Sequence, residues 1–262
     1  MTTTAVPVTS THLSGVFCDV DAAVAAAREA FLAFSDCFLA QRRTFIKAVR
    51  EAASQQERLE YMATAAVEET RMGNAHHKVL KNLYAATRTP GVEDLVMEAH
   101  QGDDGLTTLE YSPYGVIGAI TPTTNPTETI ICNTVGMLSA GNTVVFSPHP
   151  RARRLSAWLV DVLNRAMIEA GAPENLITLI AEPTPATTTA LINHPDITML
   201  VATGGPQIVN MVLSSGKKAI GAGSGNPPAV VDETADVAKA ASDIVQGASF
   251  DNNLPCTAEK EV

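Results

Sequence analysis

Cys256 is the residue of this sequence whose type and surroundings best suit covalent chemistry. It ends the polar, turn-rich segment 249–256, which reads Ser-Phe-Asp-Asn-Asn-Leu-Pro-Cys. A thiol with its ordinary pKa near 8.5 is ionised to only about a few per cent at neutral pH, so a site that uses it must favour the thiolate. We therefore interpret Cys256 as a candidate nucleophile. The neighbouring carboxylates Asp251 and Glu259 would raise the pKa of a thiol, and we expect both in turns or at the surface.

Three further polar loops follow apolar, strand-like segments. They read Thr-Pro-Thr-Thr-Asn-Pro at 121–126, Ser-Pro-His-Pro at 147–150 and Thr-Gly-Gly-Pro at 203–206. The first could offer amide donors to an oxyanion, the second offers a hydroxyl and an imidazole, and the third offers free backbone N–H groups to a phosphate. Structural alternatives stay open for each loop: helix capping by Asn125 and Thr127, a rigid Pro-bracketed turn, and a tight strand-to-helix connection.

These loops need a framework that brings strand ends together. Beyond residue 115, strand-like and helix-like segments alternate, which predicts βαβ units around a parallel sheet. The predicted strands are 116–120, 143–146, 176–180, 198–201, 218–220 and 229–231, and the predicted helices are 127–139, 152–170, 186–192, 207–214 and 236–247. The expected fold class is therefore α/β, a Rossmann-like open parallel sheet with flanking helices, whose ligand crevice lies at the carboxyl edge.

The first third of the chain has a different pattern. Helical spacing between residues 19 and 88 predicts three or four helices, the first beginning near Ala22 with Asp19 or Asp21 as its cap. A Gly-Asp-Asp-Gly turn followed by strand-like residues 106–111 predicts a projecting β-hairpin flap near 103–115.

The sequence divides into three predicted parts, and its composition excludes several kinds of partner. We expect a disordered N-terminus at 1–15, a cofactor-binding domain at 16–248 and the start of a catalytic domain at 249–262. A net charge of −10 argues against nucleic acid, and no stretch approaches the roughly 18–20 apolar residues of a membrane span. The four cysteines form no CxxC pair, which argues against disulfides and metal sites and favours the cytosol.

Taken together, these motifs resemble the CoA-acylating aldehyde dehydrogenases, in particular the propionaldehyde and acetaldehyde dehydrogenases of bacterial microcompartments. The resemblance rests on the loops at 121–126, 147–150 and 203–205, the glycine-rich segment 223–228 and the thiol segment 249–256, in order and with matching spacing. It implies an NAD-dependent oxidoreductase that joins a short-chain aldehyde to coenzyme A through a thioester on a cysteine. NAD and coenzyme A are therefore the expected cofactors.

The resemblance also implies a role for each matched position. Cys256 would be the nucleophile and Asn125 the oxyanion donor, with Thr124 as the alternative one residue away. Residues 203–205 would contact a pyrophosphate and residues 147–149 the adenosine side of the NAD or CoA site. The full set of expected cofactor-binding residues is Thr121, Pro122, Thr123, Thr124, Ser147, Pro148, His149, Thr203, Gly204, Gly205, Gly223, Ser224 and Gly225.

The segment 219–228 bears on what resolves the thioester. It contains neither a carboxylate nor an imidazole, whereas water-using relatives carry a glutamate on this strand-end loop. Hydrolysis needs a general base, but a thiol such as coenzyme A attacks a thioester more readily than water does. We favour the CoA-dependent reaction. A flexible glycine turn in which the missing carboxylate is incidental remains the structural alternative.

Two other functions stay open: a hydrolytic aldehyde dehydrogenase, and a non-catalytic nucleotide-binding or assembly module. Family members continue for roughly another domain's length, so we expect this 262-residue chain to be weakly active or inactive alone and the full-length form to be a homo-oligomer. The resemblance leaves two locations, the free cytosol and the inside of a microcompartment, where shell or cargo proteins would be partners.

Overall fold

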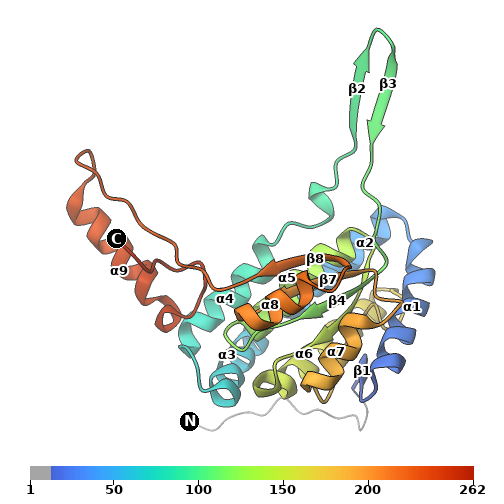
Figure 1. The fold of residues 1–262 in the computed structure, drawn as a ribbon, viewed down its shortest axis with the longest axis horizontal. Coiled ribbons are helices and arrows are strands. Elements are labelled where there is room, and N and C mark those ends of the chain that lie inside the picture. The colour runs from blue at the N-terminus through green and yellow to red at the C-terminus, as the bar shows by residue number, and fades with distance from the viewer. Residues whose placement is uncertain (1–12) are drawn as a thin grey trace.

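The computed structural model describes residues 13–262, and a six-stranded parallel sheet forms its centre (Figure 1). The strands lie in the order β1 (Val16–Phe17), β6 (Ile177–Ile180), β5 (Thr143–Ser147), β4 (Val116–Ile120), β7 (Met199–Thr203) and β8 (Lys218–Ala222). The predicted Rossmann-like α/β fold is confirmed. Strand β1 was not predicted, because two residues are too few to show a period.

Helices cover both faces of this sheet. On one face lie α1 (Val20–Ser35), α7 (Pro185–Asn193) and α8 (Pro206–Leu213), and on the other lie α2 (Leu39–Ser54), α5 (Pro126–Ser139) and α6 (Arg153–Glu169), with α3 (Gln56–Thr70) and α4 (Ala75–Arg88) packed outside them. Strands β4, β5 and β6 are buried along their whole length, as parallel strands between two helical layers must be. Their Val, Ile and Leu side chains each contribute about 1.5–3 kcal/mol on burial.

Helix boundaries follow the caps closely. Helix α1 begins at Val20 because Asp19, not Asp21, accepts the Ala22 N–H at 2.8 Å. Helix α4 begins after Asn74, whose side chain accepts the His77 N–H at 3.2 Å. The described part of the N-terminal region thus holds four helices, α1–α4, within the predicted three or four.

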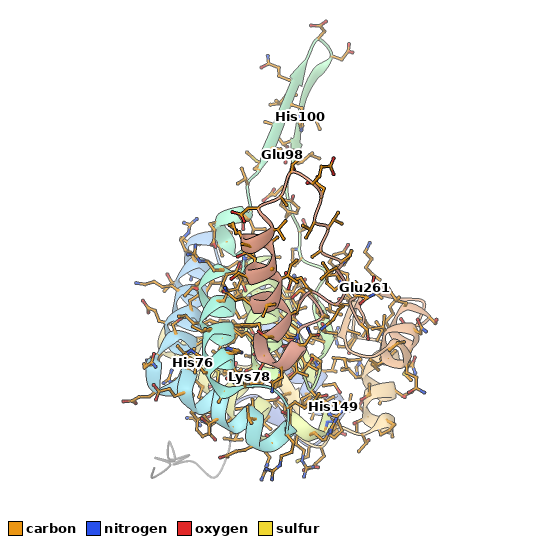
Figure 2. The ribbon with its side chains drawn as sticks, turned by 90° about the vertical axis from the view of Figure 1, so that its left-hand side faces the viewer. His76, Lys78, Glu98, His100, His149 and Glu261 are labelled. Carbon is orange, nitrogen blue, oxygen red and sulfur yellow. The ribbon has the colours of Figure 1, made fainter. Side chains whose placement is uncertain are left out.

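Two segments project from this body (Figure 1). The first is the antiparallel hairpin of β2 (Glu98–Gly102) and β3 (Gly105–Leu109), whose side chains are all exposed. It begins earlier than the flap predicted near 103–115, because β2 has little strand character in sequence. Figure 2 shows Glu98 and His100 on this hairpin, away from the sheet.

The second projection is the C-terminal arm, residues 223–262. It contains α9 (Val237–Ser249), which has no buried residue, and the short helix η3 (Phe250–Asn253). The predicted strand at 229–231 is wrong. The segment forms no ladder, because Pro227 and Pro228 lack N–H donors and Val230 is 90% exposed, so it has no face to bury. The predicted domain division at 248–249 falls in the last turn of α9 and stays a prediction.

Most of the predicted disordered N-terminus lies outside the described residues. Near the first described residue, the Ser14 N–H donates to Asp161 Oδ1 at 2.6 Å, which attaches the chain to α6 just before β1. Within residues 13–262, no helix combines the length and the apolar character needed to cross a bilayer.

Candidate functional site

The carboxyl ends of the central strands open into one cleft of about 880 Å³, a size typical of small-molecule sites. The loops after β4, β5, β7 and β8 and the thiol segment meet there. All the predicted site residues line the cleft: Thr121, Pro122, Thr123, Thr124, Asn125, Ser147, Pro148, His149, Thr203, Gly204, Gly205, Gly223, Ser224, Gly225 and Cys256. The lining residues that sequence reasoning missed include Pro183, Thr184, Thr188 and Met211, which follow β6 or lie on α7 and α8. The threonines among them lie in the run Pro-Thr-Pro-Ala-Thr-Thr-Thr at 183–189, which follows β6 and was the available signal.

Asn125 does not cap α5 with its side chain. It occupies the N-cap position, but its carboxamide makes no capping hydrogen bond. Instead, Asn125 Oδ1 accepts from Lys81 Nζ at 2.5 Å, and Asn125 Nδ2 donates to Thr124 Oγ1 at 3.2 Å. The Thr127 hydroxyl donates to Glu128 Oε2 at 3.2 Å. The capping alternative for this loop is therefore wrong, and the Asn125 amide stays at the wall of the cleft.

Thr121 carries a buried hydroxyl without a protein partner. The residue is 2% exposed, lines the cleft, and its Oγ1 makes no hydrogen bond. Buried polar atoms nearly always have a partner, and leaving one unsatisfied costs about 1–3 kcal/mol. A polar ligand group in the cleft would remove that cost, so this hydroxyl fits a bound cofactor or substrate.

The loop after β5 is a rigid turn, as its prolines suggested. His149 Nδ1 accepts the Arg151 N–H at 3.1 Å and caps the short helix η2 (Pro150–Ala152). Burial, and secondly the Arg151 charge, lowers the pKa of His149, so its imidazole is neutral at neutral pH. With Nδ1 accepting, the ring proton sits on Nε2. His149 can therefore donate a hydrogen bond to a ligand, but its acceptor nitrogen is already engaged.

The glycines after β7 only partly match expectation. The Gly204 N–H donates to the Ala222 carbonyl at 3.1 Å, because the β7–β8 ladder continues one residue beyond the strand. The expectation of a free N–H is therefore wrong at Gly204. Gly205 is the N-cap of α8, and Pro206 takes its first turn, as the sequence predicted.

A strained turn precedes Cys256 in the thiol segment. Asp251, Asn252 and Asn253 all have left-handed backbones, with φ of 49°, 56° and 59°. Such conformations cost of order 1–2 kcal/mol per residue, although Asn and Asp tolerate them best. Asn253 Nδ2 donates to the carbonyls of Ala248 at 2.5 Å and Glu259 at 3.1 Å. The turn persists because side-chain bonds such as these fix it.

The strongest anchor of this turn is the carboxylate of Asp251. It is fully buried and accepts from the Asn74 N–H at 2.7 Å, Lys78 Nζ at 3.2 Å and Lys81 Nζ at 2.5 Å. Burial would raise the pKa of this carboxyl, but the Lys81 and Asn74 hydrogen bonds and the two lysine charges hold it below its ordinary value of 3.8. Asp251 thus lies in a turn, one of the two expected positions, and its carboxylate is buried.

Lys78 and Lys81 are functional-site neighbours that sequence reasoning missed. Figure 2 labels Lys78 on α4, close to the lower end of α9. Burial, the largest cause, lowers the pKa of Lys78, against the opposing charge of Glu128. Two lysines three residues apart in a predicted helical region were the available signal. Nothing near them in sequence, however, identified their partner Asp251, which lies 173 residues from Lys78 and 170 from Lys81.

Gly225 packs directly against the backbone of Cys256. A Cβ added at Gly225 would lie 1.9 Å from the Cys256 carbonyl oxygen and 2.9 Å from its carbonyl carbon. At Gly223, the same addition meets nothing within 4 Å. The glycine loop therefore sets the position of the thiol segment, and it needs a glycine at 225 for close approach.

Substitution of Gly225 by alanine is expected to destabilise the thiol segment by about 1–3 kcal/mol, because the backbone must move to relieve overpacking. Hydrogen exchange of the amides at 250–258 measures this local stability. Gly223→Ala is the matched control and should change it by less than about 0.5 kcal/mol. Equal protection in both variants would show that the close approach does not constrain the segment.

Known proteins match this chain over almost its whole length. The model of the aldehyde dehydrogenase family matches residues 5–262. A propanal dehydrogenase (CoA-propanoylating) of Salmonella typhimurium strain LT2 is 49% identical over 248 residues, covering 95% of this chain and 53% of that protein. An acetaldehyde dehydrogenase (acetylating) of the same organism is 45% identical over 255 residues, covering 97% and 54%.

A solved structure is similar in fold as well as sequence. The Rhodopseudomonas palustris propionaldehyde dehydrogenase with bound propionyl-CoA superposes with a TM-score of 0.92 at 58% identity, covering 95% of this chain and 56% of that one. This chain therefore spans about half the length of the proteins that it matches.

Proposed function

This chain belongs to the aldehyde dehydrogenase family, and on that basis we propose that it carries the cofactor cleft and the nucleophile of a CoA-acylating aldehyde dehydrogenase. The proposed reaction converts a short-chain aldehyde, coenzyme A and NAD⁺ to an acyl-CoA and NADH. Relatives named for propanal and for acetaldehyde support short aliphatic aldehydes as the substrate class.

The cleft has features that suit the two cofactors. Its volume of about 880 Å³ leaves room for a ligand. The unpartnered Thr121 hydroxyl offers that ligand a hydrogen-bond partner. In the proposed arrangement, residues 203–205 hold a pyrophosphate and residues 147–149 an adenosine. When bound, NAD accepts the hydride of the captured aldehyde and coenzyme A accepts the acyl group.

The residues of this chain supply the covalent step. The Cys256 thiolate attacks the aldehyde carbon, the C=O π-bond breaks, and its electron pair moves to oxygen. Asn125 Nδ2 is the proposed donor to that oxyanion. A donor placed in advance at the developing charge is worth about 10²–10³-fold in rate. When the C=O bond re-forms and the hydrogen on that carbon leaves as hydride, the acyl group remains on Cys256 as a thioester until a second nucleophile removes it.

The observation that favours coenzyme A over water is the composition of the cleft wall. Among the described residues that line it, none is Asp or Glu. The acceptor nitrogen of His149 is engaged by the Arg151 N–H, so this imidazole is not free to deprotonate water. A thiol nucleophile depends less on such a base, which makes transfer to coenzyme A the better-supported outcome.

The test uses the longest natural polypeptide that contains this sequence. With propionaldehyde and NAD⁺, we expect NADH formation to fall at least about 10²-fold when coenzyme A is omitted, since no base activates water. Mass spectrometry should identify propionyl-CoA as the product. Propionate formed at the same rate without coenzyme A would instead support a hydrolytic enzyme. Binding of NAD or coenzyme A without turnover would support a nucleotide-binding module.

Assembly and location are part of the same proposal. We infer a homo-oligomer, and the exposed apolar side chains on and beside the hairpin support it, since they leave an apolar surface for a subunit contact: Leu106, Leu109 and Tyr111. Light scattering of the purified protein tests the oligomer, and a monomeric mass would contradict it. The free cytosol and the inside of a microcompartment remain the proposed locations, which cell fractionation separates.

A further inference from the structure

A single ammonium group joins three side chains beside the cleft. Lys81 Nζ lies 2.5 Å from Asn125 Oδ1, 2.5 Å from Asp251 Oδ2 and 3.3 Å from Glu128 Oε1. The Lys81 side chain is only 12% exposed. Asn125 comes from the β4–α5 loop, which lines the cleft, and Asp251 from the turn that precedes the lining residues Leu254 and Cys256, so Lys81 bridges these two segments.

We propose that Lys81 is a positioning residue that sets the orientation of the Asn125 carboxamide relative to Cys256. It would act on the reaction through Asn125, without contact to the substrate. The inference rests on the proposed function only in the roles given to Cys256 as nucleophile and Asn125 as oxyanion donor.

The chemistry of an amide explains why an ammonium matters here. A carboxamide has one acceptor end and one donor end, which exchange places when the group turns over. Lys81 offers only donors, so it attracts Oδ1 and would repel Nδ2. Charge-assisted hydrogen bonds are also stronger than neutral ones. The ammonium therefore keeps Nδ2 on the opposite side, where one N–H meets Thr124 Oγ1 and the second is left for another acceptor.

Lys78 provides a matched comparison on the same helix. Its Nζ also donates to Asp251 Oδ2, at 3.2 Å, but its second acceptor is the backbone carbonyl of Thr124, at 3.0 Å. Both lysines thus hold the turn before the thiol and the β4–α5 loop. Of the two, Lys81 is the one that contacts the Asn125 carboxamide. The effect of losing Lys78 should therefore depend less on the Asn125 side chain than the effect of losing Lys81 does.

The experiment isolates oxyanion formation from the rest of the reaction. In the longest natural polypeptide containing this sequence, p-nitrophenyl acetate acylates Cys256 without NAD or coenzyme A. The thiolate sulfur bonds to the acetyl carbon, the ester C–O bond breaks, and p-nitrophenolate leaves with the electron pair. The single-turnover burst of p-nitrophenolate gives the acylation rate. The variants are Lys81→Met, Lys78→Met and Asn125→Ala, alone and combined.

We expect Lys81→Met to lower the acylation rate on the order of 10- to 100-fold, because the donor is no longer held in place. In the Asn125→Ala background, Lys81→Met should lower the acylation rate by less than about 2-fold, since the carboxamide that Lys81 orients is absent. The factors by which Lys78→Met lowers the rate should differ less between the two backgrounds than those of Lys81→Met do. Lys81→Gln removes the charge but keeps a polar group beside Asp251, and it replaces Lys81→Met in the cycle if the methionine variant does not fold.

Each outcome separates this inference from the proposed function. If Asn125→Ala leaves the burst unchanged, the oxyanion role is wrong and the inference fails with it. If Asn125→Ala slows the burst but the Lys81 effect is equal in both backgrounds, Lys81 only supports the fold and the inference alone is overturned. Loss of coenzyme A dependence in the full reaction, with the burst coupling intact, would overturn the proposed reaction and leave Lys81 in its positioning role.

Discussion

Replacing Cys256 by alanine is expected to lower CoA-dependent aldehyde oxidation by on the order of 10⁴-fold or more, because the reaction loses its covalent intermediate. The half-buried Cys256 lines the cleft, and Gly225 fixes its backbone. Steady-state NADH formation with propionaldehyde and coenzyme A, in the longest natural polypeptide containing this sequence, measures the loss. Intact-mass spectrometry after mixing with propionyl-CoA should show one acyl adduct on the wild type and none on the variant.

The control for this substitution is Cys18→Ala. Cys18 is exposed and is not among the residues that line the cleft, so its loss should change the rate by less than about 2-fold. Activity retained in Cys256→Ala would remove the basis of the proposed function, since none of the other described cysteines lines the cleft.

Replacing Asp251 by asparagine is expected to cost about 3–5 kcal/mol of folding free energy, because it removes the charge of the buried carboxylate to which Lys78 and Lys81 both donate. Urea unfolding followed by the fluorescence of Trp158, the one tryptophan in the sequence, measures this loss. Hydrogen exchange at 250–254 should rise with it, since the left-handed turn loses its main anchor.

Asp243→Asn is the matched control on the same arm. Asp243 pairs with Lys239, but both side chains are exposed, so its loss should cost less than about 1 kcal/mol. Equal destabilisation by the two substitutions would mean that burial of the Asp251 pair contributes nothing specific.

The contribution of the Asp251 carboxylate to folding stability depends on pH. Folding lowers the pKa of this carboxyl, so its contribution to stability is present above the unfolded pKa near 3.8 and is lost as the pH falls through the lower folded value. The difference between wild type and Asp251→Asn should stay constant from about pH 5 to 8 and shrink below about pH 4. A difference that instead grew towards low pH would contradict the assigned direction of the shift.

The strand ends were predictable because buried parallel strands appear in the sequence as short apolar runs. Strand β4 at Val116–Ile120 has the predicted bounds, and the loops after β4, β5, β7 and β8 meet at one edge, as the topology requires. The polar residues after each strand were thus enough to outline the cleft from sequence.

What the sequence could not show are contacts set by tertiary packing. The strand predicted at 229–231 has suitable side chains but no surface to bury them, and the Gly204 N–H is taken up by an extension of the β7–β8 ladder. Asp251 reads as a turn residue by composition, and its burial beneath α4 depends on lysines far away in the chain.

The distance in sequence between Lys78 and Asp251 has a consequence for biosynthesis. The two residues are 173 positions apart, so at ribosomal rates of about 5–20 residues per second the lysine is made roughly 9–35 s before its counter-ion. Glu128 is translated earlier, and its negative charge already lies 3.3 Å from Lys81 Nζ and also favours the charged form of Lys78. Until Asp251 emerges, the nascent α4 therefore lacks the buried carboxylate to which Lys78 and Lys81 both donate, and this helix should complete its docking late in vectorial folding.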